Sequence, residues 1–295
     1  MAILDLGRLN QILGNVNARW RAAQPTRAHR LGFVPGPADH SLELREQLAI
    51  SNHTRFMAMS TALAAAAPTY PTATDWRNYP AQGGLPAGSY VTDIRDQGDC
   101  GCCVAFGTLA AFESASLIGA KNPGLEVDYS EADLYYCHAE AEQHRTCDGA
   151  NEGWWPDAAL ACCQNPGVVD EDCFPYTAGD QACNKCADWN TRLHKISQSQ
   201  KLTDPTAMKQ WLATKGPLIT CITVYEDFYS YGSGVYHHVS GASLGGHCIC
   251  CVGYDDSQQF WICKNSWNAS WGDQGFCNIA YGQVGVDATM WALQI

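Results

Sequence analysis

Three cysteines lie within four positions in the stretch Gln97–Phe106, which reads QGDCGCCVAF. From Cys103 to Ile118 the chain is apolar, with no proline and one glycine, and this pattern predicts a helix that is buried on all sides and stops at Gly119. A cysteine in the first turn of such a helix faces unpaired backbone N–H groups and the positive end of the helix dipole. That environment favours the thiolate, which is the nucleophilic form. The stretch therefore predicts a nucleophile at Cys103.

A cysteine nucleophile needs a base that takes its proton and a group that orients the base. His247 opens the strand-like run HCICCV, and Asn265 follows another such run, FWICK. Gln97 precedes Cys103 by six positions and can supply a side-chain N–H. Together they offer a nucleophile, a base, an orienting group and an oxyanion donor. We expect these four side chains to form a catalytic set.

The sequence around these residues resembles the papain family of cysteine peptidases. The family has Gln-Gly-x-Cys-Gly-Ser-Cys-Trp-Ala-Phe around its nucleophile, and the corresponding positions here are Gln97–Phe106. Its Lys-Asn-Ser-Trp-x-x-x-Trp-Gly is intact from Lys264 to Gly272, and its histidine followed by a small apolar run and Val-Gly-Tyr matches His247–Tyr254. The resemblance runs to the C-terminus from Asp75-Trp76-Arg77, and it includes Ser130–Cys137 and Phe174-Pro175-Tyr176.

This resemblance implies peptide-bond hydrolysis through a thioester acyl-enzyme, without a cofactor. Thiolate Cys103 would attack the carbonyl carbon, and imidazolium His247 would protonate the leaving amine. The backbone N–H of Cys103 and the side chain of Gln97 would hold the oxyanion. Asn265 would orient His247, and Trp267 would shield the hydrogen bond between them.

The chain departs from the family pattern beside the nucleophile. Cys102 replaces a small Ser or Ala, Val104 replaces a Trp, and Gly246 stands where the family often has Asp or Asn. A second thiol next to Cys103 is either inert or a point of sensitivity to oxidation.

The expected substrate-binding positions also follow from the resemblance. The family's Cys-Asn-Gly-Gly reads Cys147-Asp148-Gly149-Ala150 here. Its second glycine pairs its backbone with extended substrate, and Ala150 can keep that role if its φ is negative. We therefore expect substrate along Gly149 and Ala150, beside Gly246 and against Trp267.

Sixteen cysteines are many for a chain of this length. The resemblance implies two disulfides, Cys100–Cys147 and Cys137–Cys183, and a further bridge between Cys173 and Cys186 stays open. The cysteines on strand-like runs are interpreted as small buried hydrophobes, namely Cys248, Cys250, Cys251, Cys263 and Cys277. The alternative is zinc bound through Cys183-x-x-Cys186 or through Cys248 and its neighbours. No second pair has convincing ligand spacing, so we expect no metal.

The elements that must position these residues indicate an α+β chain, because helical patterns come first and short β-rich runs follow Lys195. The resemblance implies the papain-like fold, with an active-site cleft between two halves. Residues 71–190 would form the helix-rich half with the buried helix and Cys103. Residues 191–295 would form the strand-rich, barrel-like half with the catalytic histidine and asparagine.

Residues 1–70 are expected to form an N-terminal arm. Helical spacing of apolar residues predicts an amphipathic helix over Asp5–Ala22, and a second helical pattern covers Ser41–Ala67. Leu31–Pro37, which reads LGFVPGP, should be extended because of its prolines. Family members are commonly made with an inhibitory pro-segment, so we expect this segment to cross the cleft or its rim and to restrain activity. The alternative is a structural arm packed far from Cys103.

The composition of the chain indicates which partners and which cellular compartments are compatible with it. A net charge of −12 argues against nucleic acid and anionic membranes, and no apolar stretch is long enough to span a bilayer. The start of the chain lacks the basic and apolar regions of an ordinary signal peptide. The cysteine content instead favours an extracellular, periplasmic or lysosome-like compartment, so localisation stays open.

An active endopeptidase acting on peptides or proteins is the function that the sequence favours. The alternatives are an exopeptidase or transpeptidase, a catalytically silent homologue that binds peptides, and a zinc-binding structural protein. The intact set of Gln97, Cys103, His247 and Asn265 argues against the silent homologue.

Overall fold

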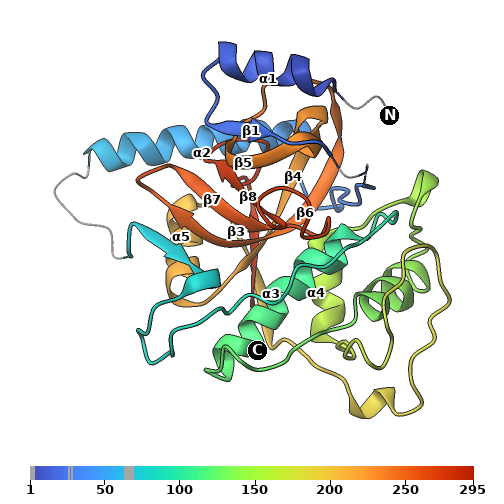
Figure 1. Ribbon diagram of the computed structural model, residues 1–295. Coiled ribbons are helices and arrows are strands. Elements are labelled where there is room, and N and C mark those ends of the chain that lie inside the picture. Colours follow the sequence, from blue (N-terminus) through green and yellow to red (C-terminus); the bar gives the residue numbers. More distant parts are fainter. Residues whose placement is uncertain (1–3, 26, 28, 63–69) are drawn as a thin grey trace.

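One long sheet and one buried helix organise the chain in the computed structural model, which describes residues 4–25, 27, 29–62 and 70–295 (Figure 1). The helices are α1 (Leu6–Asn15), α2 (Leu42–Ala62), α3 (Cys103–Gly119), α4 (Pro156–Gln164) and α5 (Pro205–Thr214). Short helical turns are η1 (Trp76–Asn78), η2 (Asp133–Glu140), η3 (Gly149–Asn151), η4 (Trp189–Thr191) and η5 (Glu226–Ser230). None of the helices in the described part is long and apolar enough to cross a bilayer.

The strands join in the order β1-β5-β8-β7-β6-β4-β9-β3, and β2 also pairs with β6. Their bounds are β1 (Trp20–Ala22), β2 (Ala73–Asp75), β3 (Gln198–Leu202), β4 (Leu218–Tyr225), β5 (Tyr231–Tyr236), β6 (Ser243–Asp255), β7 (Phe260–Lys264), β8 (Phe276–Ala280) and β9 (Met290–Gln294). Strands β5 and β8 are parallel, and the other pairs are antiparallel. The α+β character expected from the sequence is therefore present.

Helix α3 is the expected buried helix, and it sits against the central strand β6. Its residues from Cys103 to Ser114 are all buried. A Cβ at Gly107 would lie 2.9 Å from the sulfur of Cys248, so the helix and the strand are in close contact. This packing sets the N-terminus of α3 beside the middle of β6.

The N-terminal arm differs from its predicted helices. Helix α1 ends at Asn15, seven residues before the expected end, and residues 20–22 form β1, which pairs with β5. The buried ring of Trp20 packs on Tyr231 and Tyr236, and this tertiary contact overrides the helical spacing. Helix α2 starts as expected and runs to Ala62, while residues 63–67 of the predicted helix lie outside the described part.

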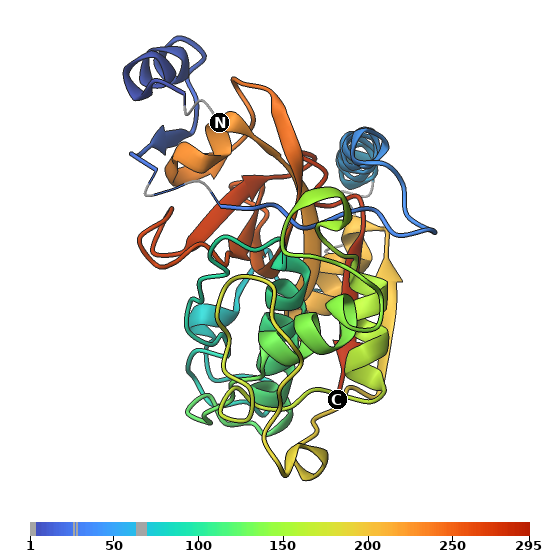
Figure 2. The ribbon, with the colours of Figure 1, turned by 90° about the vertical axis from the view of Figure 1, so that its right-hand side faces the viewer.

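The arm then passes between the two halves of the molecule. In Figure 2 the blue segment after β1 runs between the strand-rich part and the helix-rich part before it reaches α2. Phe33 forms a bridge to Trp154 on one side and to Gly246 on the other. The extended conformation predicted for Leu31–Pro37 is confirmed for this part of the segment.

Candidate active site

The N-terminus of α3 presents Cys103 to strand β6. The backbone N–H of Cys248 donates a hydrogen bond to the Cys103 sulfur, at 3.3 Å. Both residues are fully buried. Because His247 immediately precedes Cys248, the strand that carries the expected base lies against the expected nucleophile.

His247 is oriented by Asn265, which follows the end of β7. The Nε2 atom of His247 lies 2.7 Å from Oδ1 of Asn265. Since an amide oxygen only accepts, this nitrogen carries the proton. The other nitrogen, Nδ1, is buried without a hydrogen bond to any described residue, so it is free to exchange a proton with a thiol. The indole of Trp267 stacks on His247 with the ring centroids 4.6 Å apart, which is the shielding position expected for it.

The side chain of Gln97 is held in place from the strand-rich half. Its Oε1 accepts a hydrogen bond from the Ser266 hydroxyl at 2.7 Å, which directs the amide nitrogen the other way. That nitrogen donates to the carbonyl oxygens of Cys100, at 2.9 Å, and of Arg30, at 3.0 Å. The expected oxyanion donor is thus engaged by a peptide carbonyl of the arm.

Three further hydrogen bonds hold the arm between the halves. The N–H of Phe33 donates to Gly246 O at 3.0 Å, and the N–H of Val34 donates to Trp154 O at 3.0 Å. In the reverse direction, the N–H of Trp154 donates to Gly32 O at 2.7 Å. The arm therefore adds a short strand to both walls of the site.

Two glycines make this close approach possible. A Cβ at Gly32 would lie 1.8 Å from the carbonyl oxygen of Gly101, two residues before the nucleophile. Gly153 has a φ of +84°, and a Cβ there would lie 2.6 Å from Gly32 O. Any other residue at either position would push the arm away from α3.

The expected substrate-binding positions are only partly brought together. Gly246 pairs with the arm, and Trp267 lies beneath its His29. Gly149 and Ala150 are exposed in turn η3 and form no backbone hydrogen bond with the described part of the arm. The arm pairs instead with Trp154, and Gly153 lies against Gly32. The chain turns outward at Gly149, with a φ of +81°, before it returns to the cleft. A glycine directly before Trp154-Trp155-Pro156 is the signal that could have located this wall.

Burial controls the ionisation of the pair. It raises the pKa of the Cys103 thiol to about 12, although the N–H groups of Cys248 and Gly32 favour the thiolate. It lowers the pKa of His247 to about 3, against the opposing effect of the hydrogen bond to Asn265. Cys103 and His247 are therefore both neutral in this arrangement, whereas the sequence predicted a thiolate. Desolvation raises the pKa of the thiol by more than the helix N-terminus lowers it.

The cysteine pairs expected from the sequence are bonded. The structure contains Cys100–Cys147, Cys137–Cys183 and the open third candidate, Cys173–Cys186. Cys183 and Cys186 are each consumed in a bridge, which removes them as zinc ligands. The strand cysteines are buried, as interpreted, namely Cys248, Cys250, Cys251, Cys263 and Cys277.

Cys102 lies behind Gln97, the expected oxyanion donor. Its buried sulfur lies 3.1 Å from the hydroxyl of Tyr176, and that hydroxyl donates to Gln97 O at 2.7 Å. The second thiol thus packs behind Gln97, and burial raises its pKa well above the ordinary value.

Comparison with known proteins places this geometry in a family. Residues 70–292 match the family model described as papain family cysteine protease. The chain belongs to the papain family. The matched region begins where the arm ends and includes every residue of the expected catalytic set.

Relatives in the papain family carry cathepsin names. Cathepsin B-like CP3 of Giardia intestinalis is 34% identical over 200 residues, which are 64% of each chain. Cathepsin B of Dictyostelium discoideum is 31% identical over 231 residues, which are 71% of each chain. This chain thus matches slightly less than two thirds of the length of the Giardia relative.

Solved procathepsins share the fold. Procathepsin B S9 from Trypanosoma congolense superposes with a TM-score of 0.67 at 20% identity, covering 100% of this chain and 98% of the other. Digestive procathepsin L 3 of Tenebrio molitor gives 0.68 at 20% identity, covering 98% and 88%. The papain-like α+β fold predicted from the sequence is confirmed.

Proposed function

We propose that this chain is a cysteine endopeptidase that hydrolyses peptide bonds, held latent by residues 1–70. Residues 71–190 and 191–295 are its two halves, and the cleft between them is the site of peptide cleavage. The observation that carries the proposal is the buried His247–Asn265 hydrogen bond next to a helix-terminal Cys103. A set so arranged provides the nucleophile, the base and the orienting group of a thiol protease.

The proposed reaction starts when the arm leaves and water returns to the cleft. The proton of Cys103 passes to Nδ1 of His247, and the resulting thiolate attacks the substrate carbonyl carbon. The oxyanion is held by the side chain of Gln97 and the backbone N–H of Cys103, which has no partner within its helix. His247 protonates the leaving amine, and a water that it then activates releases the acid from the thioester.

The proposed restraint rests on how the arm meets the catalytic groups. The Arg30 carbonyl occupies the amide of Gln97, and the Gly32 N–H faces the Cys103 sulfur. In this proposal the arm therefore occupies the space in front of the sulfur that a substrate would need. Both walls of the cleft are also engaged by Gly32–Val34. In this proposal peptide substrates use the same walls after the arm has left.

Hydrolysis of a fluorogenic dipeptide amide tests the function, with a thiol reductant kept low enough to spare the disulfides. The chain with its arm released should turn over this substrate, and Cys103→Ala should abolish turnover. A silent peptide-binding homologue would bind the peptide without hydrolysing it in either form. Persistent turnover by a folded Cys103→Ala protein would redirect attention to Cys102.

A further inference from the structure

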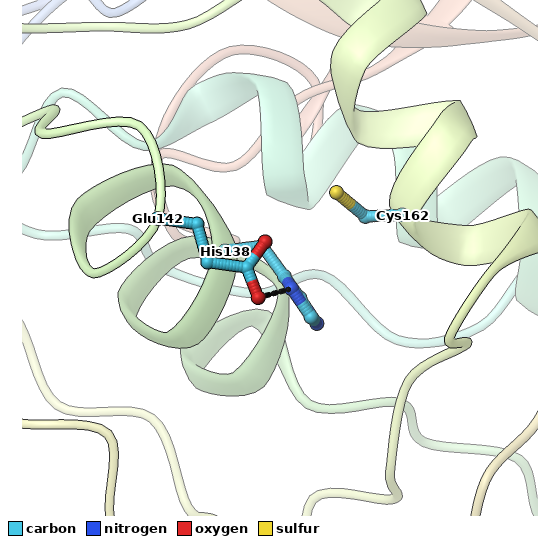
Figure 3. A group of neighbouring side chains, drawn as sticks. All are labelled: His138, Glu142 and Cys162. Atoms are coloured by element: carbon cyan, nitrogen blue, oxygen red, sulfur yellow. Dashed lines mark ion pairs between the residues drawn. The ribbon is translucent and has the colours of Figure 1, made fainter.

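Three metal-binding side chains converge in the helix-rich half, separate from the catalytic set. Figure 3 shows the side chains of His138, in η2, and Glu142, in the turn after it, beside each other, with Cys162 of α4 nearby. One ligand atom from each lies within 4.8 Å of the others, and His138 Nδ1 is 3.1 Å from a Glu142 oxygen. None of the three takes part in the proposed peptidase chemistry.

His138 is the observation that points to a ligand. Its side chain is only 3% exposed, and neither ring nitrogen makes a hydrogen bond to a described residue. A buried polar group without such a partner is uncommon in native proteins. Glu142 approaches Nδ1 alone, so Nε2 is left without any hydrogen-bonding partner among the described residues.

Cys162 faces the same point with an unpaired sulfur. It is a free, buried cysteine on α4 and forms no disulfide. A bound cation stabilises the thiolate form of such a cysteine, which then serves as a ligand.

Imidazole, thiolate and carboxylate are together the donors that Zn²⁺ accepts. Two nitrogen or oxygen ligands of a tetrahedral zinc ion lie about 3.3 Å apart, close to the 3.1 Å between His138 and Glu142. His138 lies in η2 and Glu142 in the turn just beyond the end of η2 at Glu140, and the two side chains meet there. The Glu142 side chain is 58% exposed, which leaves an entry path and a place for a water as fourth ligand.

We propose that His138, Glu142 and Cys162 form a zinc site that fastens α4 to η2 and to the turn that follows it. Because the unfolded chain lacks the assembled site, zinc also raises the midpoint of thermal unfolding.

Zinc content tests the proposal in the full chain with its disulfides intact. The parent for every variant is Cys103→Ser, which removes the nucleophile as a competing thiolate. After incubation with Zn²⁺ and dialysis, the parent should retain one zinc per chain. Cys162→Ser and Glu142→Gln should each weaken zinc binding by more than about tenfold, since even loss of an outer-shell partner costs about 10–100-fold. Glu142→Gln changes an exposed side chain and should fold normally.

Matched controls are His144→Ala, an exposed histidine two residues beyond Glu142, and Cys163→Ser, the neighbouring cysteine on α4. Both should bind zinc like the parent. With Co²⁺ as the probe, the parent and His144→Ala should show a thiolate-to-cobalt charge-transfer band, and Cys162→Ser should lack it. Circular dichroism of the metal-free proteins checks the fold. A parent that retains no zinc, or zinc and cobalt signals unaffected by both Cys162→Ser and Glu142→Gln, would overturn the proposal.

Discussion

The imidazole of His29 lies flat on the indole of Trp267, with the ring centroids 5.1 Å apart and the planes 5° from parallel. The same indole stacks on His247. His29 is buried, and neither of its nitrogens makes a hydrogen bond to a described residue. His29 of the arm and His247, the candidate catalytic base, therefore stack on the same indole. Docking of the arm is thereby coupled to the packing around His247.

Acidification should release the arm through His29. Burial and Arg27 lower the pKa of docked His29 to about 4, although Asp96 and Asp99 oppose the shift. A free arm has the ordinary value of about 6.5. Above pH 6.5 the neutral ring docks without penalty, and as pH falls from 6.5 to 4 docking weakens by about 3 kcal/mol in total. The peptidase activity of the full chain should be measured at a series of pH values from 6.5 to 4. It should rise as the pH falls.

The matched variant for this pH effect is His29→Phe, which keeps a ring on Trp267 and cannot take up a proton. We expect its activation to move to lower pH. His247, whose pKa is also lowered in the docked state, still contributes to release. His40→Phe, at an exposed position of the arm, should behave as the unmodified chain does. Identical activation profiles for His29→Phe and the unmodified chain would remove His29 as the sensor.

Gly32→Ala should activate the full chain at neutral pH. The added methyl group cannot fit 1.8 Å from Gly101 O, and such overpacking typically costs about 1–3 kcal/mol. That cost corresponds to a released fraction roughly 5- to 150-fold larger. Initial rates of dipeptide hydrolysis give the measurement. Gly14→Ala is the control, because a Cβ there meets nothing within 4 Å, and an unchanged rate for Gly32→Ala would contradict the occluding role of this segment.

The thiol of Cys103 should react slowly while the arm is docked. Burial raises its pKa to about 12, so almost no thiolate is present at neutral pH, and the arm also blocks access. Alkylation by iodoacetamide at pH 7, followed by mass spectrometry of the Cys103 peptide, should be much faster in Gly32→Ala than in the unmodified chain. Equal rates in the two proteins would show that the arm does not protect the sulfur.

Arg45 of α2 should strengthen docking of the arm. Its buried guanidinium lies 5.2 Å from the ring of Phe33 and 5.4 Å from that of Trp291, and it donates to Cys221 O at 3.1 Å. Arg45→Ala removes these contacts, a loss of about 1–3 kcal/mol. We expect a lower thermal midpoint together with higher activity of the full chain. Arg55→Ala, at an exposed position of the same helix, should change neither quantity.

The catalytic set could be read from the sequence because each member stands in a short local pattern. The position of Cys103 at a helix N-terminus follows from the apolar run after it, and His247 and Asn265 follow from strand-like runs. Those strands meet at α3 as the patterns require. The structure therefore brings these residues together as the sequence predicted, and their catalytic roles remain proposals.

What escaped the sequence depends on contacts between distant segments. The neutral state of Cys103 results from burial among segments that lie far apart in the sequence, and no local pattern reveals that burial. The substrate wall was expected at Ala150, but the loop turns outward there. The chain instead meets the arm a few residues later, next to Gly153. Strand β1 was read as helix because the packing of Trp20 outweighs local periodicity.

The pairing of β1 with β5 has a consequence for any form that has lost the arm. Trp20–Ala22 occupies the outer side of β5, at one end of the sheet. Without it, the backbone N–H and C=O groups of β5 become an open edge onto which a strand of another molecule can add. Removing the whole arm would therefore end latency but expose an edge that favours self-association. Releasing only the central segment of the arm would leave that edge covered by β1.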